Sequence, residues 1–253
     1  MKNPKVVLWD LETLPNAQEV YKRLPSIGAW PGRTLKAELQ TIMCFGYKVL
    51  DGESQSINSW DYGDVSDDSA LVSMAYDILH DADEIVTHNG KSFDLRHLNT
   101  RLVHYGMPPL PKIQHVDTKQ VAKSHLSLYS NSLDNVAQFF GVGEKIHWAN
   151  KWNTWYKFAF NEDTKADREL MDKYCKMDVD VLEQVYLKLR PFINSNVNRN
   201  QFTDGKVCPT CGSDNIMKNG TRRTKTKTYQ RYLCQSCGST SRSDNKDENL
   251  RGL

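Results

Sequence analysis

The sequence predicts a mixed α/β domain, with helices packed on the faces of one sheet, followed by a small cysteine-rich module. Three observations support this fold class. Predicted strands come first in the chain and then alternate with helices, the last predicted helix is long and amphipathic, and four of the six cysteines fall in the last quarter. Strands that alternate with helices favour a mixed sheet with helices on its faces.

Short apolar runs between turn residues predict the strands. These runs occupy residues 6–9, 41–50, 54–60, 84–87 and 113–116. Apolar residues at helical spacing predict the helices, over residues 69–80, 92–103, 133–140 and 167–189. Gly141 and Pro191 mark the ends of the last two helices.

The polar segment 194–204 lacks apolar periodicity and predicts a linker. We therefore expect a first domain over residues 1–193, then this linker, a cysteine module over residues 205–242 and a disordered tail over residues 243–253. The charge divides in a similar way. Residues 201–253 hold 10 lysines and arginines against 5 acidic residues, whereas the rest of the chain holds 23 against 26. A basic C-terminal part attracts phosphate groups.

No stretch of the sequence approaches the roughly 18 consecutive apolar residues that a membrane-spanning helix needs. The N-terminus runs directly into the first apolar strand, without the pattern of a secretory signal. We expect a protein without membrane association, in the cytoplasm of a bacterial or phage-infected cell.

Carboxylates occur at three places that the predicted elements can bring together. Asp10 and Glu12 end the first strand two residues apart, so both side chains point to one face and can share one cation. Mg²⁺ and Mn²⁺ prefer such oxygen ligands. Asp94 begins a helix, although the helix dipole alone favours an acidic residue there. Tyr174 and Asp178 are spaced i, i+4 and share one face of the last helix.

The motifs Asp-x-Glu, Asn-Gly-x-x-Phe-Asp and Tyr-x-x-x-Asp occur in this order, and they resemble those of the DEDD exonuclease superfamily. The resemblance covers about residues 5–190, including the segments 115–118 and 132–134. It fits the tyrosine branch, with its DnaQ-like and YprB-like proteins of ribonuclease H-like fold, because Lys173 stands where the histidine branch carries histidine. Two further acids on this helix, Asp172 and Asp180, are interpreted as solvated surface residues.

The resemblance implies a two-metal active site. Four carboxylates would hold two Mg²⁺ or Mn²⁺ ions around the scissile phosphate: Asp10, Glu12, Asp94 and Asp178. Tyr174 would orient the attacking water. Thr13, Asn89 and Phe93 would contact the substrate, although Phe93 is equally well interpreted as a core residue.

The segment 146–160 interleaves six aromatic residues with Lys151 and Lys157. Such an alternation can stack bases and bind phosphates along a single strand. A lid helix or loop that buries its tryptophans explains the same residues, and the pattern does not choose between the two.

Four cysteines form two Cys-x-x-Cys pairs separated by 22 residues: Cys208, Cys211, Cys234 and Cys237. A glycine follows each pair, which is typical of a structural tetrahedral Zn²⁺ site. Four thiolates close the coordination sphere, so this zinc would have no catalytic role. Cys44 and Cys175 stand alone and are interpreted as buried thiols.

Between the cysteine pairs, the sequence predicts a basic hairpin that resembles the zinc ribbons of transposases and transcription factors. Five of its residues suit contacts with phosphate groups: Arg222, Arg223, Lys225, Lys227 and Arg231. The alternatives are a hairpin that serves only as a folding unit and a ribbon that binds protein.

Together with the resemblance, the sequence predicts a metal-dependent 3′→5′ exonuclease that releases nucleoside monophosphates from single-stranded or frayed DNA. DNA is preferred to RNA as the partner. The alternatives are an exoribonuclease, an inactive nucleic-acid-binding adaptor and a transposase-like strand-transfer enzyme. The complete set of carboxylates argues against the adaptor, and Tyr-x-x-x-Asp does not match the third acidic position of transposases.

Overall fold

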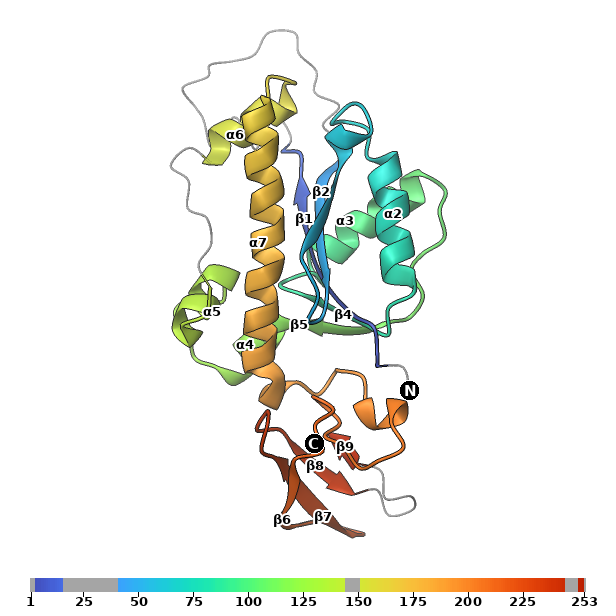
Figure 1. Cartoon of the computed structure of the whole chain (residues 1–253), viewed down its shortest axis with the longest axis vertical. Helices are drawn as coiled ribbons and strands as arrows, with labels where there is room; N and C mark the ends of the chain where they lie inside the picture. Colours follow the sequence, from blue (N-terminus) through green and yellow to red (C-terminus); the bar gives the residue numbers. More distant parts are fainter. Residues whose placement is uncertain (1–2, 16–40, 144–150, 244–249, 253) are drawn as a thin grey trace.

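The computed structural model describes residues 3–15, 41–143, 151–243 and 250–252 of the chain (Figure 1). It contains one five-stranded mixed sheet with helices on both faces and, beyond it, a four-stranded sheet. The predicted fold class is therefore confirmed. Within the described ranges, every helix is too short or too polar to cross a membrane.

The five-stranded sheet has the order β3-β2-β1-β4-β5. β1 lies in its centre, antiparallel to β2 and parallel to β4, while β3 and β5 form the edges. All five strands were predicted from the sequence, with small differences in their ends. Their bounds are β1 (Val6–Thr13), β2 (Ile42–Val49), β3 (Gln55–Asn58), β4 (Glu84–Thr87) and β5 (Gln114–Asp117).

The longer helices of the first domain are α2 (Ser69–His80), α3 (Asp94–His104), α4 (Thr118–His125), α5 (Leu133–Phe140), α6 (Lys151–Ala159) and α7 (Lys165–Leu189). α4 was not expected, because its eight residues contain little apolar periodicity. Its N-terminus is fixed by Asp117, whose carboxylate accepts hydrogen bonds from the first backbone amides of the helix. α3 begins at Asp94 rather than at Ser92.

The central strand β1 contributes to two different hydrophobic cores. Val7, Trp9 and Leu11 pack with α2 and α3 on one face of the sheet. Val6 and Leu8 pack with α7 on the other. Because side chains alternate along a strand, the next even-numbered residues of β1 also face the α7 side.

Two acidic side chains hold α7 against the antiparallel edge of the sheet. Asp172 accepts hydrogen bonds from Asn58 at 3.2 Å and from Ser56. Asp180 accepts a hydrogen bond from Lys48 at 2.9 Å. Each of these two aspartates therefore has a partner on β2 or β3, and the side chain of Asp180 is still 43% exposed, as expected of a surface acid.

The segment 194–204 is not a free linker. It contains a short 3-10 helix, η4 (Arg199–Phe202). The backbone amide of Val197 donates to the buried carboxylate of Glu84 at 2.8 Å, and the amide of Arg199 donates to the carbonyl of Pro209 at 3.0 Å. The segment therefore binds the first domain on one side and the cysteine module on the other.

The cysteine module is built on the second sheet, with the strands β6 (Ile216–Arg223), β7 (Thr228–Cys234), β8 (Thr240–Ser243) and β9 (Leu250–Gly252). It lies beyond the C-terminal end of α7 (Figure 1), where the hydroxyl of Ser239 donates to the carbonyl of Arg190 at 3.4 Å. The expected disordered tail is wrong for Ser243 and residues 250–252, which pair in the sheet. Residues 244–249 and 253 lie outside the described ranges.

Candidate active site

Three carboxylates meet on the α7 face of the five-stranded sheet. Asp10 and Glu12 lie on β1 and Asp178 lies on α7, and their ligand oxygens are all within 4.8 Å of one another. The two β1 residues are half-buried and Asp178 is buried. The alternation of β1 directs Asp10 and Glu12 toward α7, and the helix supplies the third carboxylate.

Gly46 of β2 allows α7 to come this close. It pairs with Asp10 across the two strands. A Cβ atom at Gly46 would lie 2.8 Å from the carbonyl oxygen of Cys175 and 3.1 Å from Cγ2 of Val179, so any side chain would push the helix away. The sequence analysis missed this residue. A glycine inside a strand often marks such a close approach, and that signal could have found it.

The ring of Tyr174 is buried beside the three carboxylates. It packs edge-on against Trp155, with 6.0 Å between ring centroids, and its hydroxyl is hydrogen-bonded to Asp178. Burial raises the pKa of Tyr174 far above its usual value, and the charges of Glu12, Asp178 and Asp10 raise it further. The hydroxyl therefore stays protonated at neutral pH and can act as a hydrogen-bond donor.

Asp94 lies beside the three carboxylates but outside their group. Its Oδ1 accepts a hydrogen bond from the backbone amide of Leu11 at 3.1 Å. β4 pairs with β1 only as far as Leu8, so Asp94 supplies an acceptor to β1 beyond the end of that pairing. Burial raises the pKa of Asp94 to about 7. The expected four-carboxylate cluster is thus a group of three with a fourth acid at the adjacent edge of β1.

Asp117 fixes the loop that leads into Asp94. Its carboxylate accepts hydrogen bonds from the backbone amides of Asn89 at 3.0 Å and Lys91 at 3.2 Å. Asn89 has a positive φ of 78°, a conformation that asparagine adopts more readily than most residues. Because Asp117 also caps α4, one buried carboxylate fixes both the loop and the helix.

The residues expected to contact the substrate lie at the rim of this region. Thr13 is the last residue of β1, and Asn89 follows β4; both are half-buried. Phe93 is 39% exposed, and its ring packs edge-on against His97. The interpretation of Phe93 as a core residue is therefore wrong, and the substrate contacts of all three residues stay predictions.

The aromatic segment is a core element where the structure describes it. Trp155 and Phe158 of α6 are buried, and the ring of Phe158 stacks on that of Trp60. Lys157 forms an ion pair with Asp167 at 2.9 Å, which occupies the amine in a contact within the protein. These contacts favour the helix that buries its aromatic residues. Trp148 and the side chain of Trp152 lie outside the described part.

The four sulfur atoms of the cysteine module also lie within 4.8 Å of one another. The Sγ atoms of Cys208 and Cys237 are 3.7 Å apart, and those of Cys211 and Cys234 are 3.6 Å apart. A tetrahedral site with Zn–S bonds of about 2.3 Å requires sulfur atoms roughly 3.8 Å apart, so the cluster fits zinc. Hydrogen bonding to Cys208 and Cys237 raises the pKa of Cys211, so a bound cation is needed to keep all four sulfurs ionised.

The two cysteine pairs have the same backbone geometry. The amide of Gly212 donates to the carbonyl of Cys208 at 2.9 Å, and the amide of Gly238 donates to that of Cys234 at 3.0 Å. Both glycines have a positive φ. The remaining cysteines are not isolated as expected, because the sulfur atoms of Cys44 and Cys175 are in contact between β2 and α7.

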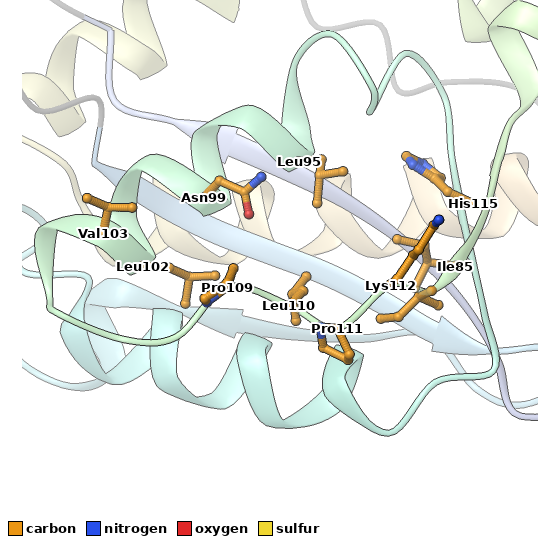
Figure 2. A pocket seen from close by; sticks show the side chains of 11 residues that line it. Ile85, Leu95, Asn99, Leu102, Val103, Pro109, Leu110, Pro111, Lys112 and His115 are labelled. Carbon is orange, nitrogen blue, oxygen red and sulfur yellow. The ribbon is translucent and has the colours of Figure 1, made fainter.

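A separate cavity of about 390 Å³ opens between α3, β4 and the segment 109–113 (Figure 2). Its lining is mainly apolar, with Leu95, Leu102 and Leu110 around it and His115 at one end. It lies on the α3 side of the sheet, whereas the three carboxylates face α7. The cavity therefore does not belong to the carboxylate site.

The chain belongs to the RNase_H superfamily, whose family model matches residues 33–190. The matched region includes Asp94, Tyr174 and Asp178 and begins after Asp10 and Glu12. No curated protein matches the chain. Among solved structures, the family B DNA polymerase from the hyperthermophilic archaeon Pyrobaculum calidifontis is similar, with a TM-score of 0.54 and 16% identity. The similarity covers 89% of this chain but only 32% of the polymerase chain, and it shows a shared fold.

Proposed function

We propose that this protein is a metal-dependent 3′→5′ exonuclease that acts on single-stranded or frayed DNA and releases nucleoside monophosphates. The observation that carries the proposal is the meeting of Asp10, Glu12 and Asp178 with the hydroxyl of a buried tyrosine, in a domain of the RNase_H superfamily. Members of this superfamily with such carboxylates cleave phosphodiester bonds with divalent metal ions.

The donor set fits hard divalent cations. Three carboxylates with ligand oxygens within 4.8 Å of one another can bind an ion such as Mg²⁺ or Mn²⁺. Two such ions, when bound, activate a water for attack and stabilise the charge on the leaving oxygen. We assign Asp10, Glu12 and Asp178 to these ions. We assign Asp94, which lies against the backbone of β1 at Leu11, as the fourth carboxylate of the metal site.

Tyr174 is assigned to orienting the attacking water. Its raised pKa keeps the hydroxyl neutral, so it donates a hydrogen bond and does not act as a base. Its ring is fixed by Trp155 of α6, which limits the positions that the hydroxyl can take. A group held in this way contributes mainly to the transition state, because its orientation is set before the substrate binds.

Two features favour exonucleolytic cleavage of DNA. The Tyr-x-x-x-Asp motif on α7 is typical of the tyrosine branch of DEDD exonucleases, which remove nucleotides from 3′ ends. The fold is also similar to about a third of the chain of a DNA polymerase. An exoribonuclease is the second candidate, because the same carboxylates can cleave both polymers and only contacts with the 2′-hydroxyl separate them.

The cysteine module is assigned as a zinc ribbon with one structural Zn²⁺. The sulfur distances of 3.6 and 3.7 Å support zinc, and the repeated backbone geometry at both pairs supports a structural role. Residues 205–242 contain eight lysines and arginines and one acidic residue, which supports a role in binding nucleic acid.

The proposal is tested by digestion of 5′-labelled DNA and RNA oligonucleotides of one sequence, with Mg²⁺ and with Mn²⁺. We expect a ladder that shortens one nucleotide at a time on DNA, and protection when the last linkages at the 3′ end are phosphorothioates. Shortening of the RNA alone would favour the exoribonuclease. Internal cleavage, or no cleavage of either polymer, would overturn the proposal.

Tyr174→Phe tests the role of the tyrosine hydroxyl. The variant keeps the buried ring and its contact with Trp155 and removes only the donor. We expect kcat to fall by about 10²-fold or more while KM stays near the wild-type value, as for other single groups that act in the transition state. An unchanged kcat would show that the hydroxyl does not orient the water.

A further inference from the structure

The register of the second sheet sorts the basic residues of the hairpin onto two faces. Arg222 of β6 pairs with Tyr229 of β7, and Arg231 of β7 pairs with Arg242 of β8. Directly paired residues lie on the same face of an antiparallel sheet, as do residues two apart on one strand. These four side chains therefore share one face, which we call the arginine face: Arg222, Tyr229, Arg231 and Arg242.

The other basic residues of the β6–β7 hairpin lie outside these paired positions. Arg223 pairs with Thr228 and Lys218 pairs with Tyr232, so both lie on the opposite face of the sheet. Lys225 and Lys227 fall in the turn between β6 and β7. The five basic residues singled out in the sequence thus do not form one surface, and Arg242 joins the arginine face without having been predicted.

A direct side-chain contact confirms the shared face. The guanidinium carbon of Arg242 lies 4.7 Å from the centroid of the Tyr229 ring, so the two groups stack. Tyr229, Arg231 and Arg242 are each half-buried, and Arg222 is exposed. The backbone of Arg251 on β9 lies opposite Arg242, which places a further arginine position in the same row.

This arrangement places cationic side chains next to one another on one face. Arg231 and Arg242 face each other directly across two strands, and like charges in that position destabilise a sheet. In the ranges that the structure describes, neither forms an ion pair with a carboxylate, and the buried Nε of Arg231 has no hydrogen-bond partner. An anionic ligand would relieve this repulsion.

We propose that the arginine face is the surface with which this protein binds single-stranded nucleic acid. The arginines contact phosphates, and an unpaired base stacks on the flat Tyr229–Arg242 pair. An aromatic ring beside cations is the usual platform for single strands, because every base has a π-face and a single strand can unstack its bases to expose it. The inference takes nucleic acid as the ligand from the proposed function. It assigns the binding of that ligand to the arginine face of the four-stranded sheet.

The test compares two double variants that remove the same charge from opposite faces. Arg231→Gln with Arg242→Gln changes the arginine face, and Lys218→Gln with Arg223→Gln changes the other. Binding of a 20-nucleotide single strand and of the matching duplex is measured by fluorescence anisotropy over a salt series, with zinc-loaded full-length protein and no Mg²⁺ or Mn²⁺. One zinc per chain in each variant shows that the module is intact.

We expect the arginine-face variant to bind the single strand at least about tenfold more weakly, with a salt slope shallower by roughly 1.4, or 0.7 for each lost phosphate contact. The opposite-face variant should stay within about threefold of the wild type. Tyr229→Leu should also weaken binding by about tenfold, whereas Tyr229→Phe should not, because it keeps the stacking ring.

Equal losses in the two double variants would overturn the proposal and show a diffuse electrostatic attraction. Unchanged binding in the arginine-face variant, or a loss confined to the duplex, would overturn it as well. The outcome is independent of catalysis. If the protein binds through the arginine face but cleaves neither polymer, only the proposed exonuclease activity is refuted. If it is an exonuclease whose binding does not depend on the arginine face, only the present inference is refuted.

Discussion

The carboxylate site and the cysteine cluster both gather metal ligands, but the chain builds them in opposite ways. The cysteine cluster takes its ligands from two short segments, 208–211 and 234–237, and each segment closes on itself through backbone hydrogen bonds. The carboxylate site takes its ligands from β1 and α7, which stand at opposite ends of the first domain's sequence. One site depends on local geometry and the other on packing between distant elements.

This difference predicts how each site responds to mutation. Local backbone turns shape each cysteine segment, and the β6–β7 hairpin, in which Ile216 pairs with Cys234, brings the two segments together. The carboxylate site instead depends on uncharged positions that control how closely α7 approaches the sheet, such as Gly46. Substitutions in the packing between sheet and helix should therefore damage the carboxylate site and leave the cysteine cluster unchanged.

The largest effect is expected at a carboxylate ligand. Asp178→Asn keeps the size of the side chain and removes the charge that would hold a cation, so kcat/KM should fall by about 10²- to 10³-fold. Asp180→Asn is the matched control two residues along the same helix. Its carboxylate is bound to Lys48, and it should keep activity within a few-fold. Similar losses in both variants, measured on a short oligonucleotide, would contradict the assigned ligand set.

The second effect concerns the cysteine cluster. Cys234→Ser should lower the zinc content from one ion per chain to none, because small four-cysteine domains do not hold their fold without metal. Cleavage of a short oligonucleotide at saturating protein should persist, since the carboxylates lie in the first domain. Metal analysis and activity of the same samples check both points. Cys44→Ser is the control and should retain zinc; loss of zinc there would link the two sites.

Gly46→Ala tests whether close packing sets the carboxylate site. The added Cβ meets a backbone carbonyl of α7, so we expect the free energy of unfolding to fall by about 1–3 kcal/mol. Activity should fall by about tenfold or more, while zinc content stays at one ion per chain. Gly205→Ala is the control, because nothing lies within 4 Å of a Cβ there. Full activity in Gly46→Ala would mean that α7 adjusts without moving Asp178.

The smallest effect is a pH dependence at the junction of the two regions. Burial raises the pKa of Glu84 above its model-compound value of 4.5, although hydrogen bonds from Val197 and Tyr186 oppose the shift. The folded protein therefore binds a proton more tightly than the unfolded chain, and the stability that this gives is present below about pH 4.5 and is lost as the pH rises through the folded pKa.

Glu84→Gln removes this titration. The free energy of unfolding of both proteins is measured with denaturant across pH 4–8. The value for the wild type minus the value for the variant should decline as the pH rises. A difference that stays constant or grows with pH would show that Glu84 is not held at a raised pKa. Zinc content and activity should stay unchanged, because Glu84 contacts neither the carboxylate site nor the cysteine cluster.

Sequence patterns were sufficient for most elements of the fold. All five strands of the first sheet and the helices with clear periodicity were predicted, because the alternation of apolar residues reports which face of a strand or helix is buried. α4 was missed because Asp117, and not periodicity, starts it. The polar composition of residues 194–204 gave a wrong expectation, because polar residues can also pair with another part of the chain.

By itself, the sequence determined which chemical groups this protein brings to its sites: the carboxylates of three separated motifs, the tyrosine one helical turn from Asp178, and four cysteines at zinc spacing. Short spacings fix local geometry, so the cysteine cluster could be predicted almost completely. Only the tertiary structure decided that Asp94 stands apart from the other three carboxylates, that α7 packs closely against Gly46, and that Arg242 stacks on Tyr229. These contacts join residues far apart in the chain or on different strands, and they depend on strand register and helix packing, which no spacing along the sequence encodes.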